Sequence, residues 1–308
     1  FIKIKKYHER IINMKFDSLS DRSKGIFFIV MSAFGFAMMS AFVKLSGDLP
    51  SLQKTFFRNI VSVAVAASII IKNKGTFFGK KENQKLLILR STLGTLGILF
   101  NFYSIDKLVL SDANMLNKLS PFFSIIFSTI FLKEKMKPKQ GIVVSMACTG
   151  AFIGSLFIIK PSFNLETIPA LIGLLGGISA AGAYTCVRGL GNKEKPNTIV
   201  FYFSFFSSMV TLPLMLGVYK PMSIQQLAYL LLAGVFASLG QFGITLAYKF
   251  APAKEISIFD YTNIIFSALI SLILFGVLPD WVSVVGYVII FLASFAIFAF
   301  NKKLDKEK

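Results

Sequence analysis

The chain has 308 residues, of which 55% are hydrophobic and only 16% are charged, and its formal net charge is +18. Soluble domains are about 45–50% apolar and about 25% charged, so this composition leaves too little polar surface for a soluble fold. The basic residues lie in short gaps between long apolar runs, so we interpret them as charges flanking membrane spans and predict no nucleic-acid partner.

The predicted elements are membrane-spanning helices, each of which needs about 20 apolar residues to cross about 30 Å of hydrocarbon. A charged arm over residues 1–24 comes first, and we expect the natural start at Met14 or a fragment, because that is the first methionine. A short basic tail over residues 302–308 comes last. Between them, ten segments qualify as spans: 25–45, 54–72, 86–105, 110–132, 140–159, 168–189, 197–218, 225–248, 255–277 and 282–300.

Lysine and arginine are distributed unevenly between the two sets of loops. With ten spans both termini lie on one side, and 24 of the 33 basic residues fall on that side, against four on the other and five within spans. Loops rich in Lys and Arg stay in the cytoplasm. We therefore predict a multi-pass protein of the cell (inner) membrane with both termini cytoplasmic.

The second half of the chain weakly repeats the first. Residues 41–44 resemble residues 185–188, and at the same shift Phe57 falls on Phe201. Because each unit has an odd number of spans, five, the second unit must be inverted relative to the first. Inverted repeats are typical of transporters, with the binding site between the halves near the midplane. We predict an all-α membrane protein of about ten transmembrane helices as two inverted five-helix repeats, over residues 25–160 and 161–301.

Ionisable side chains inside a membrane are costly and therefore point to function. Lys118 lies about eight residues into its span, roughly 12 Å deep at the helical rise, and Asp260 lies at a similar depth in the repeat-related span. We expect both to face a central cavity, where they can pair. A structural ion pair with Lys118 or Arg188 is the alternative role for Asp260.

Neighbouring polar residues complete the candidate substrate-binding set, which consists of Lys118, Asp260, Asn114, Asn117, Tyr261, Asn263, Arg58 and Lys44. Asn114 and Asn117 share a helical face with Lys118, and Asn263 follows Asp260 by three residues. For Arg58 a bond to helix-end carbonyls is equally open, as is snorkelling to the headgroups for Lys44. We expect Arg90 and Arg188, which lie near span ends, to snorkel.

The residues that metal centres and enzymes need are scarce. The chain has two cysteines, Cys148 and Cys186, and one histidine, His8. This excludes a disulfide framework and a Cys-based zinc site. One carboxylate in the hydrocarbon zone supplies no convergent catalytic set, so we predict neither an enzyme nor a cofactor.

Several segments of the sequence resemble the drug/metabolite transporter superfamily, in its two-domain EamA type. The resemblance covers roughly residues 25–300 and rests on segments 56–59, 111–116, 119–122, 131–135, Gly141, Gly150, 251–255, 260–262 and 275–281. One departure is Val277, which stands where the family has a Glu at the end of the ninth span, whereas Glu134 keeps the Glu of the fourth span. If this Glu anchors the end of a helix, the second half lacks that anchor, and the two halves are not expected to move symmetrically.

The resemblance implies an exporter or exchanger that works without ATP hydrolysis, and the sequence has no phosphate-binding P-loop. Five basic residues within the spans, against one carboxylate clearly inside the hydrocarbon zone, predict an electropositive cavity and an anionic or zwitterionic metabolite, such as an amino acid or organic acid. A drug or cation exporter, a passive channel and a structural membrane subunit are the alternatives, and a homodimer is left open.

Overall fold

The computed structural model describes residues 19–133, 138–160, 167–251 and 253–306, which form helices and no strand. Most of the predicted N-terminal arm, residues 1–18, lies outside the described residues, and so does Glu134. The first half contains α2 (Asp21–Leu45), α3 (Ser51–Lys72), the 3₁₀ helix η1 (Lys81–Asn83), α4 (Gln84–Lys107), α5 (Leu110–Asn117), α6 (Ser120–Phe131) and α7 (Pro138–Ile159). The second half contains α8 (Ile168–Leu190), α9 (Pro196–Gly217), α10 (Ile224–Phe250), α11 (Ala253–Asp260), α12 (Thr262–Phe275) and α13 (Trp281–Lys306).

Helix ends follow from the local sequence. The Ser20 hydroxyl accepts a hydrogen bond from the backbone N–H of Ser23 and so caps α2. Ser223 and Gln226 form a capping box at the start of α10, where each side chain satisfies the other's backbone N–H. These caps fix the register at which two of the predicted spans begin.

The fourth and ninth predicted spans are each divided in two, which the sequence analysis did not anticipate. α5 ends at Asn117 and α6 begins at Ser120, while only Tyr261 separates α11 from α12. Within the described part, nine segments are long and apolar enough to cross a membrane. They do not include α5 and α6, which together occupy the fourth predicted span, residues 110–132. Pro121 lies in the first turn of α6, where its missing N–H is harmless, and it cannot continue a helix from α5.

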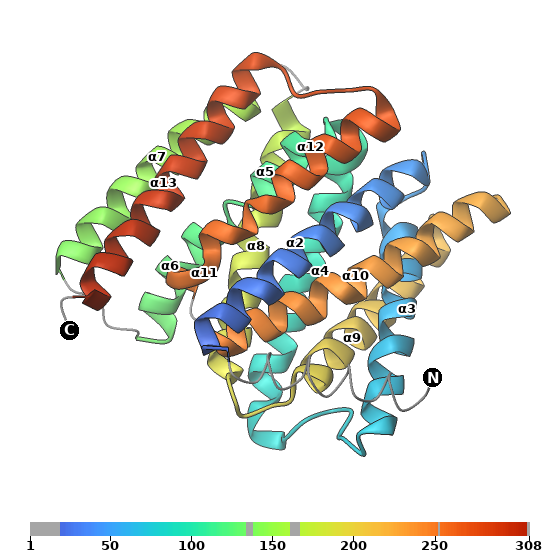
Figure 1. Cartoon of the computed structure of the whole chain (residues 1–308). Helices are drawn as coiled ribbons and strands as arrows, with labels where there is room; N and C mark the ends of the chain where they lie inside the picture. The colour runs from blue at the N-terminus through green and yellow to red at the C-terminus, as the bar shows by residue number, and fades with distance from the viewer. Residues whose placement is uncertain (1–18, 134–137, 161–166, 252, 307–308) are drawn as a thin grey trace, which may run out of the picture.

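The two halves interlock (Figure 1). The four most extensive helix contacts are α2 with α10, α4 with α8, α7 with α13 and α3 with α9. Each of these pairs takes one helix from each half, so neither half forms its own separate bundle. α7 and α13 lie side by side along one edge of the molecule, while the divided spans lie nearer its middle.

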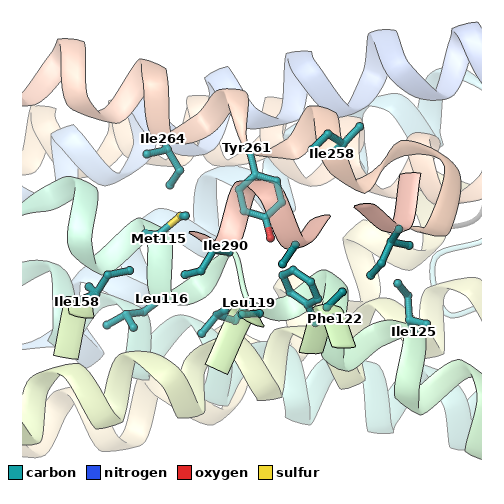
Figure 2. Packing of buried hydrophobic residues seen from close by; sticks show 14 of the residues in the cluster. Met115, Leu116, Leu119, Phe122, Ile125, Ile158, Ile258, Tyr261, Ile264 and Ile290 are labelled. Carbon is teal, nitrogen blue, oxygen red and sulfur yellow. The ribbon is translucent and has the colours of Figure 1, made fainter. Parts of the chain in front are cut away.

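Apolar side chains surround the two breaks (Figure 2). One buried cluster brings Met115, Leu116 and Leu119 together with Ile258 and Ile264 from the second divided span. Within a membrane, close van der Waals packing of these side chains stabilises the contact between the halves, because lipid offers no hydrophobic driving force between helices. The irregular backbone is thus enclosed by protein, which is the condition for non-helical backbone at membrane depth.

Candidate functional site

Lys118 and Asp260 lie at the two breaks and bond to each other. Lys118 caps the C-terminal end of α5, and Asp260 is the last residue of α11. The Lys118 Nζ lies 2.8 Å from Asp260 Oδ1, and the residues are only 6% and 2% exposed. The expected pairing of the two repeats' charges is therefore present in the structure.

The break at Lys118 frees a backbone carbonyl, and Tyr261 satisfies it. The Phe122 N–H bonds to the Leu119 carbonyl at 3.1 Å instead of continuing the regular ladder. The Tyr261 hydroxyl donates to the Lys118 carbonyl oxygen at 3.0 Å. Figure 2 shows the Tyr261 ring reaching from its own span toward Leu119 and Phe122. The two breaks thus stabilise each other: the Lys118 ammonium pairs with Asp260, and the Tyr261 hydroxyl satisfies the Lys118 carbonyl.

Helix α8 approaches the first break closely. A Cβ atom on Gly177 would lie 2.8 Å from the Leu116 carbonyl oxygen and 3.4 Å from the Asn117 Cα. These atoms are backbone and cannot move aside as a flexible side chain would. Gly177 is therefore the residue that lets α8 pack directly on the end of α5.

A polar cavity lies beside the ion pair and has a volume of about 60 Å³. That volume holds a few water molecules, since one needs about 10–15 Å³ measured in this way. Both halves contribute to its wall, which includes Ser40, Arg58, Arg90, Asn101, Asn114, Asn117, Lys118, Tyr184, Phe203, Gln241 and Asn263. The cavity thus brings polar side chains of both halves together beside the ion pair.

Arg90 is part of this wall, so the expectation that it snorkels to the headgroups is wrong. It is 1% exposed, and its guanidinium lies 3.6 Å from the centre of the Phe203 ring. Its Nη2 donates to Gln241 Oε1 at 2.8 Å. Gly94, one turn along α4, makes the room, because a Cβ there would lie 2.8 Å from Arg90 Nη1. The helix face that carries Arg90 therefore points to α9 and α10 and not to lipid.

Arg58 is fully buried on α3 and also lines the cavity. Its Nη1 donates to the side-chain oxygen of the adjacent Asn59, whose own Nδ2 donates to Ser207 Oγ at 2.7 Å. The alternative of bonds to helix-end carbonyls is not what the structure has. Asn59 and Ser207 instead fix one edge of the guanidinium from α3 and α9.

The predicted asparagines also reach the cavity wall. Asn114 accepts from Ser40 Oγ at 3.1 Å and donates to Ser267 Oγ at 2.8 Å, so it joins α2, α5 and α12. Asn263 Nδ2 donates to the Ala33 carbonyl at 2.7 Å, while its Oδ1 has no partner among the described residues. Asn114 thus has one protein partner at each of its two amide atoms, whereas the Oδ1 of Asn263 has no partner among the described residues.

Lys44 lies apart from the other candidates. Its Nζ donates to the Leu108 carbonyl at 2.7 Å and contacts the Ile105 carbonyl at 3.4 Å. It therefore satisfies carbonyls at the C-terminal end of α4 and does not line the cavity. Asp260 and Tyr261 are not in the cavity wall either, and both contact it through Lys118.

Comparisons with known proteins match both halves of the chain. Residues 23–156 and 167–299 each match the EamA-like transporter family. A pseudopaline exporter, CntI, of Pseudomonas aeruginosa is 31% identical over 276 residues, which cover 89% of this chain and 95% of that protein. Human solute carrier family 35 member G1 is 26% identical over 280 residues, or 85% of this chain and 75% of that protein.

A solved crystal structure shares the fold. It superimposes with a TM-score of 0.68 at 10% identity and covers 92% of this chain and 99% of that one. At that identity the likeness concerns the architecture alone.

Proposed function

Because the chain belongs to the EamA-like transporter family, we propose that it is a secondary transporter that moves a small anionic or zwitterionic metabolite by alternating access. The observation that carries this proposal is the Lys118–Asp260 pair, which joins the divided spans of the two halves beside a polar cavity. Substrate sites of inverted-repeat transporters lie at such breaks near the midplane.

The ion pair gives the protein a way to couple substrate binding to movement of its halves. A buried pair is stable only while each charge has its partner, because an isolated charge in a low-dielectric interior costs several kcal/mol. A substrate with an acidic group can replace Asp260 beside Lys118. The bond between the divided spans is then released, Lys118 keeps an anionic partner, and an amino group of a zwitterionic substrate takes the place of Lys118 beside Asp260.

The other candidate residues have separate roles in this proposal. Asn114, Asn117, Asn263 and Arg58 would contact the substrate from the cavity wall, while Tyr261 would hold Lys118 in position through its backbone. Lys44 would have a structural role, because carbonyls of another helix occupy it. A lipophilic cation suits this cavity poorly, because three basic residues line it and the nearby carboxylate of Asp260 is paired with Lys118.

The charge distribution supports an inner-membrane protein with both termini in the cytoplasm. Export is the direction we propose, because a relative that covers most of the chain is named an exporter. The absence of a P-loop motif from the sequence supports transport driven by solute or proton gradients.

Counterflow in proteoliposomes tests the proposal. Purified protein is reconstituted, loaded with one member of a panel of amino acids and organic acids, and assayed for uptake of the same labelled compound. We expect saturable counterflow of at least one carboxylate-bearing compound, and its loss in Lys118→Ala and in Asp260→Asn. Lys160→Ala is the matched control, since Lys160 also pairs with an aspartate but is exposed, and it should transport normally.

Two results would overturn the proposal. Unitary conductance without counterflow would make the protein a channel. Near-normal counterflow in both the Lys118 and Asp260 variants would show that the pair is only structural.

A further inference from the structure

Two arginines of the cavity wall have unpaired donors. Arg58 Nε and Nη2, and Arg90 Nε and Nη1, are buried and have no hydrogen-bond partner within the described residues. Neither guanidinium has an ion pair there, and both residues line the same cavity. Buried N–H groups are almost always satisfied in folded proteins, so four such donors around one cavity need an explanation.

Structural interactions account for only part of each guanidinium. Asn59 takes one nitrogen of Arg58, and Gln241 takes one of Arg90. The Phe203 ring covers a face of Arg90, which compensates part of the charge. The few waters that fit in the cavity can bond to the free N–H groups, but water does not neutralise two like charges in a low-dielectric site.

Adding up the charges gives the cavity an excess of two positive charges. Lys118 and Asp260 cancel each other, which leaves Arg58 and Arg90 without a counter-charge. An anion between the two guanidiniums would satisfy both the free donors and the charge. Guanidinium groups bind planar carboxylates and phosphates through two parallel N–H···O bonds, which fits the free Nε and Nη2 of Arg58, while the free Nε and Nη1 of Arg90 can each donate a single bond.

We infer that Arg58 and Arg90 form the binding site for a small dianion, either a dicarboxylate or a phosphate monoester. This inference rests on the proposed transport function and narrows it, because an amino acid with one carboxylate would leave one guanidinium unpaired. The free Oδ1 of Asn263 can accept from a hydroxyl or amino group elsewhere on the same molecule.

Thermal unfolding of the detergent-purified full chain tests this site directly. The unfolding midpoint is measured in chloride, acetate, succinate and inorganic phosphate at equal ionic strength. We expect succinate or phosphate to raise the midpoint by several degrees in a saturable manner, and acetate to do so weakly. The stronger of the two dianions identifies which oxyanion group the site takes.

Variants then assign the effect to the arginines. Arg58→Gln and Arg90→Gln should abolish the dianion shift while melting no lower than wild type in chloride, because each removes an unpaired buried charge. Arg58→Lys and Arg90→Lys keep the charge but lose the planar guanidinium with its several N–H donors. They should raise the half-saturating concentration of the dianion at least tenfold. Lys220→Gln, which removes one exposed loop charge, should leave the shift unchanged.

Failure of this inference is distinguishable from failure of the transport proposal. If all four anions shift the midpoint equally, or if both Gln variants keep the full shift, the dianion site is overturned even where counterflow persists. If a folded Gln variant is not obtained, loss of the shift in the Lys variant supports the site and its retention contradicts it.

Discussion

Two of the ion pairs among the described residues join the first half of the molecule to the second and lie in opposite environments. Lys118 and Asp260 meet at the breaks in the middle, with side chains 7% and 3% exposed. Lys160, just after α7, and Asp280, just before α13, meet at helix ends and are 41% and 54% exposed. Both pairs consist of a lysine from the first repeat and an aspartate from the second.

The difference shows what burial does to the same chemistry. An exposed pair contributes about 0–1 kcal/mol, and losing it does little harm. A buried pair is no more stabilising than packed apolar side chains, yet removing one partner costs about 3–5 kcal/mol. The Lys160–Asp280 pair is therefore an accessory contact at the edge of the molecule. The central pair adds little stability, yet its loss is costly, which is consistent with a role in the proposed exchange of partners.

Removing one aspartate from each pair should separate the two environments most strongly. We expect Asp260→Asn to lower the free energy of unfolding by about 3–5 kcal/mol, because Lys118 is left charged and buried. Asp280→Asn should lower it by at most about 1 kcal/mol. Chemical unfolding in detergent, followed by circular dichroism, measures both. Similar losses in the two variants would contradict the comparison.

The packing around the central pair can be tested without changing any charge. Gly177→Ala should destabilise the protein by about 1–3 kcal/mol, because the new methyl group overlaps the backbone at the end of α5. Gly141→Ala on α7 is the matched control, since a Cβ there has nothing within 4 Å. It should be neutral or slightly stabilising through helix propensity. Equal tolerance of both substitutions would show that α8 does not need to approach the break closely.

The smallest effect concerns the pH dependence of the edge pair. The hydrogen bond from Lys160, helped by the Ser283 N–H, lowers the pKa of Asp280 below its ordinary value. Its stabilisation is therefore fully present above about pH 4 and disappears as the pH falls through the lowered pKa. The stability gap between wild type and Asp280→Asn should shrink on acidification from about pH 6 to about pH 3. A gap that widens would mean that another group is responsible.

Much of the architecture could be predicted from the sequence, because the bilayer constrains both the length of apolar segments and the distribution of basic residues between loops. Long apolar segments and uneven loop charges gave the spans, and the five-span repeat gave the inversion. The depth of Lys118 and Asp260 then placed both charges at one level between the halves. Each of these inferences depends on position along a helix axis, which residue counting measures well.

The remaining features depend on direction around a helix, which residue counting does not measure. Arg90 lies near a span end and could have reached the headgroups, but its face of α4 turns inward. Gly94, one turn further on, was the available signal, because a small residue there leaves space for a buried side chain. Pro121 likewise signalled the first break, whereas the second break at Tyr261 has no comparable marker in the described residues.

In the transport cycle that we propose, Lys118 and Asp260 are partners whose bond is exchanged for the substrate. A double-mutant cycle measures this most directly, with detergent stability and counterflow recorded for Lys118→Ala, Asp260→Asn and the double variant. We predict that the double variant is more stable than the less stable single variant, because neither charge is then left alone, and that all three are inactive. Strictly additive destabilisation, or counterflow that survives in the double variant, would contradict the account.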